Sequence, residues 1–281
     1  MILDWPFYHH DLRRTGFTLL KGDLKESDTT QIGWKLNDSV NPGTFDFPSI
    51  ADIDANGLQE ILTATSITQG GSGTEFEGRF YVLECIKSSN KCRNFNEKWK
   101  FKRDNFTIGK SPSIDDLNND GIKEVVFAGF GVFNAADDGT VYAFKANKKG
   151  KQEKSDASYT FDLPYEADQH GSPSDDYGEI GQTIIVDIDN QGNKEVLLAD
   201  YTGVKNWRGH LYILEPGSNK QFTLQQNIQL GTSEASGGAK GAIAIANIDS
   251  DDYPEIIVPA SFGIYYNFNK LSIINNFWRL I

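Results

Sequence analysis

The segment DLNNDGIKE (116–124) is the clearest of four related segments in this sequence. The other three align with it without gaps and read DIDANGLQE (52–60), DIDNQGNKE (187–195) and NIDSDDYPE (247–255). Each segment ends in glutamate, and two aliphatic residues follow each glutamate. Self-similarity at intervals of several tens of residues is typical of a fold built from repeated units.

The residues around the four segments predict β-strands. Short runs rich in Ile, Val, Phe and Tyr are separated by turn residues, a pattern typical of all-β proteins. A strand opened by glycine follows each of the first three segments, starting at Gly78, Gly139 and Gly209. Each repeat is therefore expected to hold four antiparallel strands, the content of one β-propeller blade. A blade cannot bury both of its faces alone, so we expect the blades to stack.

The predicted fold is an all-β propeller of four-stranded antiparallel blades. An N-terminal strap (1–30) precedes the propeller repeats (31–281). The four visible blades are placed at approximately 44–103, 108–163, 179–230 and 239–281.

The loop segments carry side-chain oxygens at positions 1, 3, 5 and 9, and the carbonyl at position 7 is a further candidate ligand. Alternate oxygens on a tightly curling backbone converge on one point, and glycine at position 6 favours that turn. An all-oxygen set suits Ca²⁺ better than Mg²⁺ or a transition metal. The candidate metal ligands are Asp52, Asp54, Asn56, Leu58 and Glu60; Asp116, Asn118, Asp120, Ile122 and Glu124; Asp187, Asp189, Gln191, Asn193 and Glu195; and Asn247, Asp249, Asp251, Tyr253 and Glu255.

A metal-free turn is the alternative interpretation of each loop, because Asp and Asn side chains also bond to their own backbone N–H groups. Four copies in register favour Ca²⁺ in a structural role, stabilising the blades by linkage. The second copy is closest to the ideal pattern. The third is expected to bind more weakly because Gln191 is longer and neutral, and the turn of the fourth is in doubt because of Asn247 and Asp252.

The repeat resembles the FG-GAP (VCBS-type) repeat of integrin α-subunit propellers and their prokaryotic relatives. The resemblance rests on the loop pattern Asp-x-Asp-x-Asp-Gly-x-x-Asp/Glu, on Phe130-Gly131 and Phe262-Gly263, and on a third strand at 139–144. It covers roughly 44–275 and implies Ca²⁺ ligands at the positions given above. It also implies seven blades, which favours a portion of a larger propeller.

Four-bladed closure is the alternative, with the last blade completed either by a strand at 31–36 or by residues 277–280. The aromatic segment 5–16 resembles the lead-in of quinoprotein-like propellers. It is expected to pack on a propeller face, with a cofactor or partner surface as the other interpretation.

Composition restricts the partners and the compartment. The formal net charge of -12 argues against nucleic acid, and no apolar run is long enough to span a membrane. Twelve carboxylates stand at the candidate ligand positions, as many as the whole negative excess. No secretory signal is visible at the N-terminus. Cys85 and Cys92 are either a disulfide across a hairpin, which would indicate an oxidising compartment, or two free thiols.

The function expected from these features is a non-enzymatic, calcium-binding propeller module for extracellular or cell-surface adhesion. Its partner is expected to be a protein or a glycan bound on a propeller face. No catalytic residues are assigned. The alternative is an enzyme on the same scaffold, either a quinoprotein-like oxidoreductase or a polysaccharide-active domain, because fold alone does not determine function.

Overall fold

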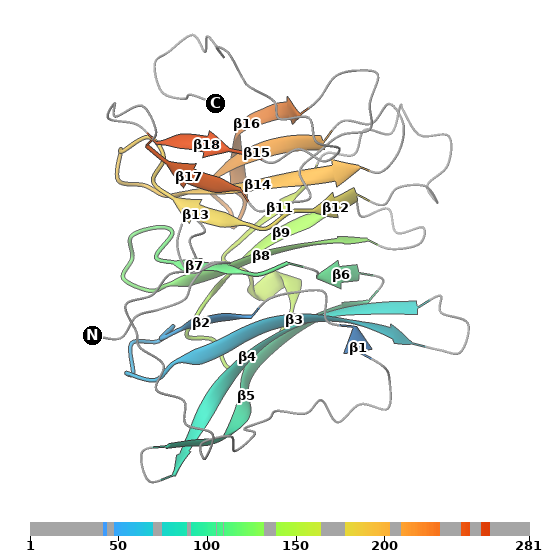
Figure 1. Cartoon of the computed structure of the whole chain (residues 1–281), viewed down its shortest axis with the longest axis vertical. Helices are drawn as coiled ribbons and strands as arrows, with labels where there is room; N and C mark the ends of the chain where they lie inside the picture. The colour runs from blue at the N-terminus through green and yellow to red at the C-terminus, as the bar shows by residue number, and fades with distance from the viewer. Residues whose placement is uncertain are drawn as a thin grey trace, which may run out of the picture.

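The chain folds into antiparallel β-sheets that follow one another along the sequence, as the computed structural model shows (Figure 1). The described regular structure is all strand apart from one 3₁₀ turn at Lys154–Asp156, so the all-β prediction is confirmed. The structure describes residues 42–43, 48–69, 75–88, 91–104, 106–108, 110–131, 139–163, 178–202, 209–230, 243–247 and 254–258.

The first repeat forms a meander. Its strands are β1 (Pro42–Gly43), β2 (Ser49–Ala51), β3 (Glu60–Gln69), β4 (Glu75–Ser88) and β5 (Lys91–Asp104). Both β1 and β2 pair with β3, and the order then runs from β3 through β4 to β5. The first loop therefore connects β2 to β3, as the repeat pattern predicts.

The next two repeats follow the same plan. The second contains β6 (Phe106–Ile108), β7 (Ser113–Asp115), β8 (Glu124–Gly131), β9 (Thr140–Lys145) and β11 (Tyr159–Asp162). The third contains β12 (Gly178–Ile180), β13 (Ile184–Val186), β14 (Glu195–Thr202), β15 (Gly209–Pro216) and β16 (Phe222–Leu230). In the fourth, the described strands are β17 (Ala244–Ala246) and β18 (Glu255–Ile257).

Two features differ from the expected four-strand blade. The strand before each of the first three loops is split into two short pieces, and both pieces pair with the strand after the loop. In addition, β10 (Gly150–Gln152) leaves the second repeat and pairs in parallel with β5 of the first sheet. The outer strand of a sheet has unpaired backbone groups, and β10 satisfies part of those on β5.

The hydrophobic core lies between consecutive sheets. Along β8, Val125 and Phe127 pack toward the first repeat, whereas Val126 and Ala128 pack toward the third. The strands β9, β14 and β15 divide their side chains in the same way, so the central strands are buried on both faces. The ring of Phe127 stacks on Phe80 of the first sheet with centroids 4.3 Å apart. Each repeat thus depends on its neighbours for burial, as expected for stacked units.

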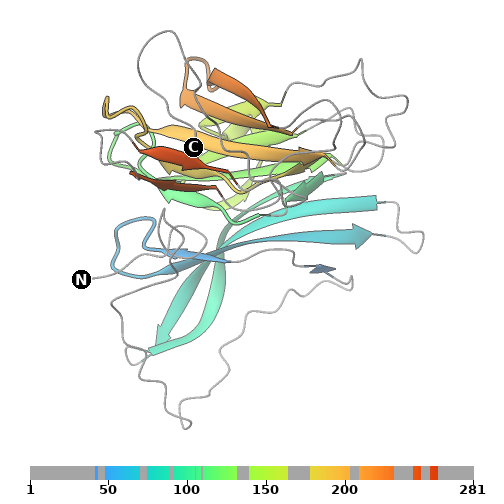
Figure 2. The same ribbon diagram turned by 45° about the horizontal axis from the view of Figure 1, so that its top comes forward.

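The sheets are layered in sequence order, from β2–β5 to β17 and β18 (Figures 1 and 2). Across the described residues they do not close into a barrel or a propeller. Several sequence-based expectations concern residues outside that part of the chain: the strap (1–30), the strand at 31–36, and residues 262–263 and 277–280. Where the structure is described, it holds no helix long and apolar enough to cross a membrane.

Candidate metal centres

Each of the first three loops folds around the carboxylate of its first residue. In the second loop, Oδ1 of Asp116 accepts the backbone N–H of Asp120 at 3.0 Å, and Oδ2 accepts that of Gly121 at 2.8 Å. The same two bonds recur at 2.8–3.1 Å from Asn56 and Gly57 to Asp52, and from Gln191 and Gly192 to Asp187. These are the turn bonds of the metal-free interpretation. A carboxylate oxygen has two lone pairs, so these bonds do not by themselves exclude a cation.

Two residues in each loop adopt the left-handed backbone conformation. At position 6 the φ values are 83° for Gly57, 83° for Gly121 and 89° for Gly192. A Cβ atom at these glycines would meet nothing within 4 Å, so the backbone angle and not the available space requires glycine. At position 4 the φ values are 57–58°, for Ala55, Asn119 and Asn190.

The glutamate at position 9 closes each loop from inside the sheet. Glu60, Glu124 and Glu195 are at most 1% exposed. The Oε2 atom of each accepts the backbone N–H of the residue at position 2, at 3.0–3.1 Å. Since the glutamate begins the strand that follows the loop, this bond anchors the loop to its sheet.

The second oxygen of Glu124 has no such partner. Its Oε1 atom is buried and accepts no hydrogen bond. Burial raises the pKa of Glu124 from 4.5 to about 7, and the nearby carboxylates of Asp120 and Asp116 add to the effect. A buried carboxylate oxygen without a partner is costly, and a cation in the loop would compensate for it.

Carboxylates converge in two of the loops. The oxygens of Asp52, Asp54 and Glu60 lie within 4.8 Å of one another, and so do those of Asp187, Asp189 and Glu195. Either group can hold a metal ion, which agrees with the positions expected from the sequence. The second loop has an amide, Asn118, at position 3.

Lysine ammonium groups approach the first two loops from neighbouring strands. Nζ of Lys98 in β5 lies 2.6 Å from Asp54 Oδ2 and 3.4 Å from Glu60 Oε1. Nζ of Lys145 in β9 lies 2.5 Å from Asp120 Oδ2. The loop pattern contains neither lysine, so sequence reasoning missed both.

The third loop has acidic surroundings instead. Burial raises the pKa of Glu195 to about 7, and the carboxylates of Asp189, Glu215 and Asp187 add to this shift. Burial, with the charge of Asp189, also raises the pKa of Glu215.

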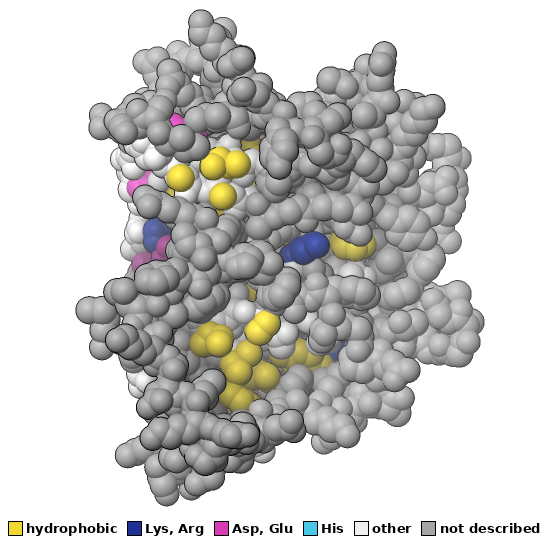
Figure 3. Space-filling view, in the orientation of Figure 1, with side chains coloured by type: hydrophobic (Ala, Val, Ile, Leu, Met, Phe, Trp, Pro, Cys, Tyr) yellow, Lys and Arg dark blue, Asp and Glu magenta, His cyan; other side chains and the backbone are white. Residues whose placement is uncertain are grey.

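The first three loops lie in a row along one edge of the sheets, at the left in Figure 1, where acidic and basic side chains meet in Figure 3. Lys123, at position 8 of the second loop, donates to the backbone oxygen of Asp52 at 3.2 Å. Lys194, at position 8 of the third loop, lies 2.7 Å from Asp115, directly before the second. Asn119 also donates to the backbone oxygen of Gly192. Adjacent loops are therefore linked by direct contacts.

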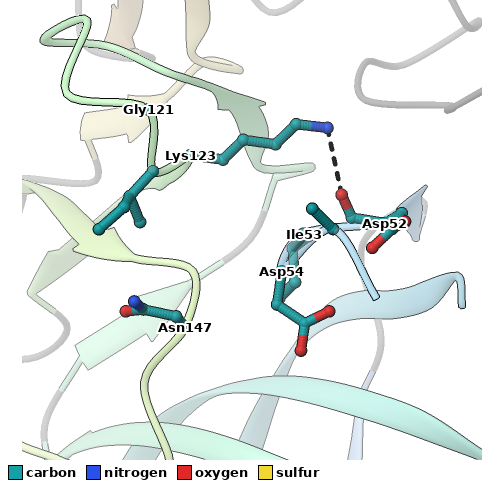
Figure 4. Close-up of a pocket in the computed structure, with 8 residues that line it drawn as sticks. Asp52, Ile53, Asp54, Gly121, Lys123 and Asn147 are labelled. Atoms are coloured by element: carbon teal, nitrogen blue, oxygen red, sulfur yellow. Dashed lines mark hydrogen bonds between the residues drawn. The ribbon is translucent and has the colours of Figure 1, made fainter. Parts of the chain in front are cut away.

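A pocket of about 350 Å³ separates the first two loops. Residues 52–55, residues 121–123 and Asn147 line it, and Figure 4 shows Lys123 extending across to Asp52. The residues that line the pocket thus include two aspartates, a lysine and an asparagine, beside the apolar residues Ile53 and Ile122.

Two further sequence-based sites are described only in part. In the fourth loop, Asn247 follows β17 and Glu255 is fully buried at the start of β18, whereas 249, 251 and 253 lie outside the described residues. Cys85 is disulfide-bonded, and Cys92 is the one other cysteine of the sequence.

No protein-family model and no curated protein matches the chain.

Proposed function

We propose that this chain is a calcium-stabilised β-propeller module of the FG-GAP type that recognises a protein or a glycan outside the cell or at its surface. The observation that carries the proposal is the buried, unpartnered Oε1 atom of Glu124 in a loop whose geometry recurs in three repeats. The first and third copies bring three carboxylates within 4.8 Å of one another, and the second copy has the same turn hydrogen bonds.

Calcium is the ion that fits this donor set. The side chains of the loops offer carboxylate and amide oxygens, without the thiolates or imidazoles that favour zinc or copper. Flexible coordination by six to eight oxygens is typical of Ca²⁺, and water completes such shells. The ion would neutralise carboxylates that now repel one another.

The layered sheets support the propeller part of the proposal. Each consecutive pair of sheets encloses its own hydrophobic cluster, as neighbouring blades do. The disulfide at Cys85 supports an oxidising, extracellular setting. The row of loops and the pocket beside Asn147 offer polar groups to a partner, in the manner of binding loops on a rigid scaffold.

Calorimetric titration with Ca²⁺ tests the metal proposal. We expect saturable binding, and the pair of changes Asp116→Asn and Glu124→Gln should remove one equivalent. Asp104→Asn is the matched control, because Asp104 is an exposed carboxylate at the end of β5. Unchanged binding after the paired substitution, or no heat at all from the wild type, would refute calcium binding at the second loop.

A glycan array and a cell-binding assay, each with Ca²⁺ and with EDTA, test recognition. A partner whose binding requires Ca²⁺ and is lost in Asn147→Ala supports a recognition surface at the loops. Binding that is indifferent to both changes would place recognition elsewhere.

A further inference from the structure

We propose that Lys98 is a tethered cation that occupies the metal position of the first loop, so that this loop folds without Ca²⁺. The inference rests on the proposed metal binding at the other loops and distinguishes the first loop from them. Lys98 becomes the residue that keeps the first loop from taking an ion.

The ammonium group of Lys98 contacts two of the candidate metal ligands of the first loop, Asp54 and Glu60. Its Nζ atom lies 2.6 Å from Asp54, 3.4 Å from Glu60 and 3.9 Å from Glu84, measured to one oxygen of each. The Lys98 side chain is only 6% exposed.

The most direct comparison is between the same oxygen in two repeats. In each repeat, Oε2 of the closing glutamate accepts a backbone N–H group. Oε1 of Glu124 is left without a hydrogen bond, whereas Oε1 of Glu60 accepts one from Lys98. The lysine therefore satisfies the atom that is unsatisfied in the second repeat. Lys145 does not take this role, since it contacts Asp120 at the exposed side of that loop.

A β-bulge aims Lys98 at the loop. Val82 pairs with Trp99 and Leu83 pairs with Glu97, so Lys98 is the extra residue between two paired ones. Such a bulge bends the strand and redirects the side chain of the unpaired residue.

The third repeat has the same bulge with a neutral side chain. Ile213 pairs with Gln226 and Leu214 pairs with Leu224, which leaves Gln225 in the position of Lys98. Gln225 donates to Glu215 at 2.8 Å and brings no positive charge. Glu215 is the counterpart of Glu84 in the repeat pattern. At the bulge, the first repeat therefore has a cationic side chain that can replace a metal, and the third has a neutral one.

A lysine at this position excludes Ca²⁺ for two reasons. The ammonium group and a divalent ion cannot both lie within contact distance of Asp54 and Glu60, because they repel each other strongly. The lysine is also tethered, so its effective concentration at the loop is high and does not depend on the Ca²⁺ concentration.

The test exchanges the two bulge residues and counts bound Ca²⁺ by calorimetry and equilibrium dialysis. Lys98→Gln copies the third repeat into the first, and we expect it to bind one equivalent more than the wild type. Adding Asp54→Asn to this variant should remove the gained equivalent. The reciprocal Gln225→Lys should lose one equivalent, and circular dichroism verifies that every variant is folded.

Asp54→Asn in the wild-type background gives an independent test that does not need Lys98 to be replaced. We expect no change in the number of bound ions, and the loss of one would overturn the inference. No gain in Lys98→Gln, with Ca²⁺ binding at the other loops intact, also overturns it while the proposed function stands. If the wild type binds no Ca²⁺ but the Lys98→Gln variant does, metal binding at the other loops is refuted, and the inference about Lys98 stands. If neither protein binds Ca²⁺, both proposals fail.

Discussion

Replacing Glu124 by glutamine should stabilise the protein without Ca²⁺ and destabilise it relative to the wild type when Ca²⁺ is bound. The pKa of Glu124 is 4.5 in the unfolded chain and about 7 in the fold. A pKa raised on folding means that the folded state binds the proton more tightly. Protonation of Glu124 therefore stabilises the folded state. This stabilisation is fully present below pH 4.5 and is lost as the pH rises through about 7.

The size of this effect follows from the shift. At about 1.4 kcal/mol per pKa unit, the loss between acidic and mildly alkaline pH amounts to about 3 kcal/mol for this group. Glutamine has no charge to bury and keeps an oxygen that can accept the N–H of Leu117, which now bonds to Glu124 at 3.1 Å. The Glu124→Gln variant should therefore lose much less stability than the wild type between pH 5 and pH 8 in EDTA.

Urea unfolding at the two pH values, with EDTA and then with excess Ca²⁺, measures both effects. Asp104→Asn removes the same charge from an exposed position and should follow the wild type in all four conditions. At pH 8 we expect Glu124→Gln to be more stable than the wild type in EDTA and less stable in excess Ca²⁺, because only the carboxylate is a strong ligand. Parallel pH profiles of Glu124→Gln and wild type in EDTA would refute the assignment of the raised pKa to this side chain.

Three further outcomes are expected. Excess Ca²⁺ at 100 times its Kd should add about 2.7 kcal/mol to the free energy of unfolding for each occupied loop. Scanning calorimetry should therefore show a Tm that falls when EDTA removes the ion. An unchanged Tm would favour metal-free turns. Gly121→Ala should lower the free energy of unfolding by about 1–2 kcal/mol, because Gly121 has a left-handed backbone. Gly129→Ala should lower it more, because the added Cβ would collide with the Phe106 ring. Equal losses in urea unfolding would contradict this. Phe127→Ala opens a cavity between two sheets and should lower the free energy of unfolding by about 3–5 kcal/mol, equally with and without Ca²⁺. A loss of stability seen only in EDTA would link this core to the metal.

Local patterns predicted the strands and loops because both depend on residues close in sequence. The positions of Asp116, Gly121 and Glu124 within one turn determine the hydrogen bonds seen there. The pairing of β10 with β5 was not predictable in this way, since residues 150–152 carry no mark of a partner about fifty positions earlier. Successive side chains of each central strand point to opposite faces, as in any β-strand. Only the stacking of sheets shows that both orientations are buried.

The relative strength of the loops is the clearest case where local sequence is insufficient. Ligand identity alone ranks the second loop first and the third loop lower, because of Gln191. The surroundings favour a different order of metal affinity. Lys145 already neutralises Asp120 in the second loop, whereas Glu215 adds negative charge beside Asp189 in the third. An amide in place of a carboxylate removes one charge from a site, and a lysine from the next strand removes just as much. We therefore expect the metal affinity of each loop to depend on the neighbouring strand of its sheet as much as on its own nine residues.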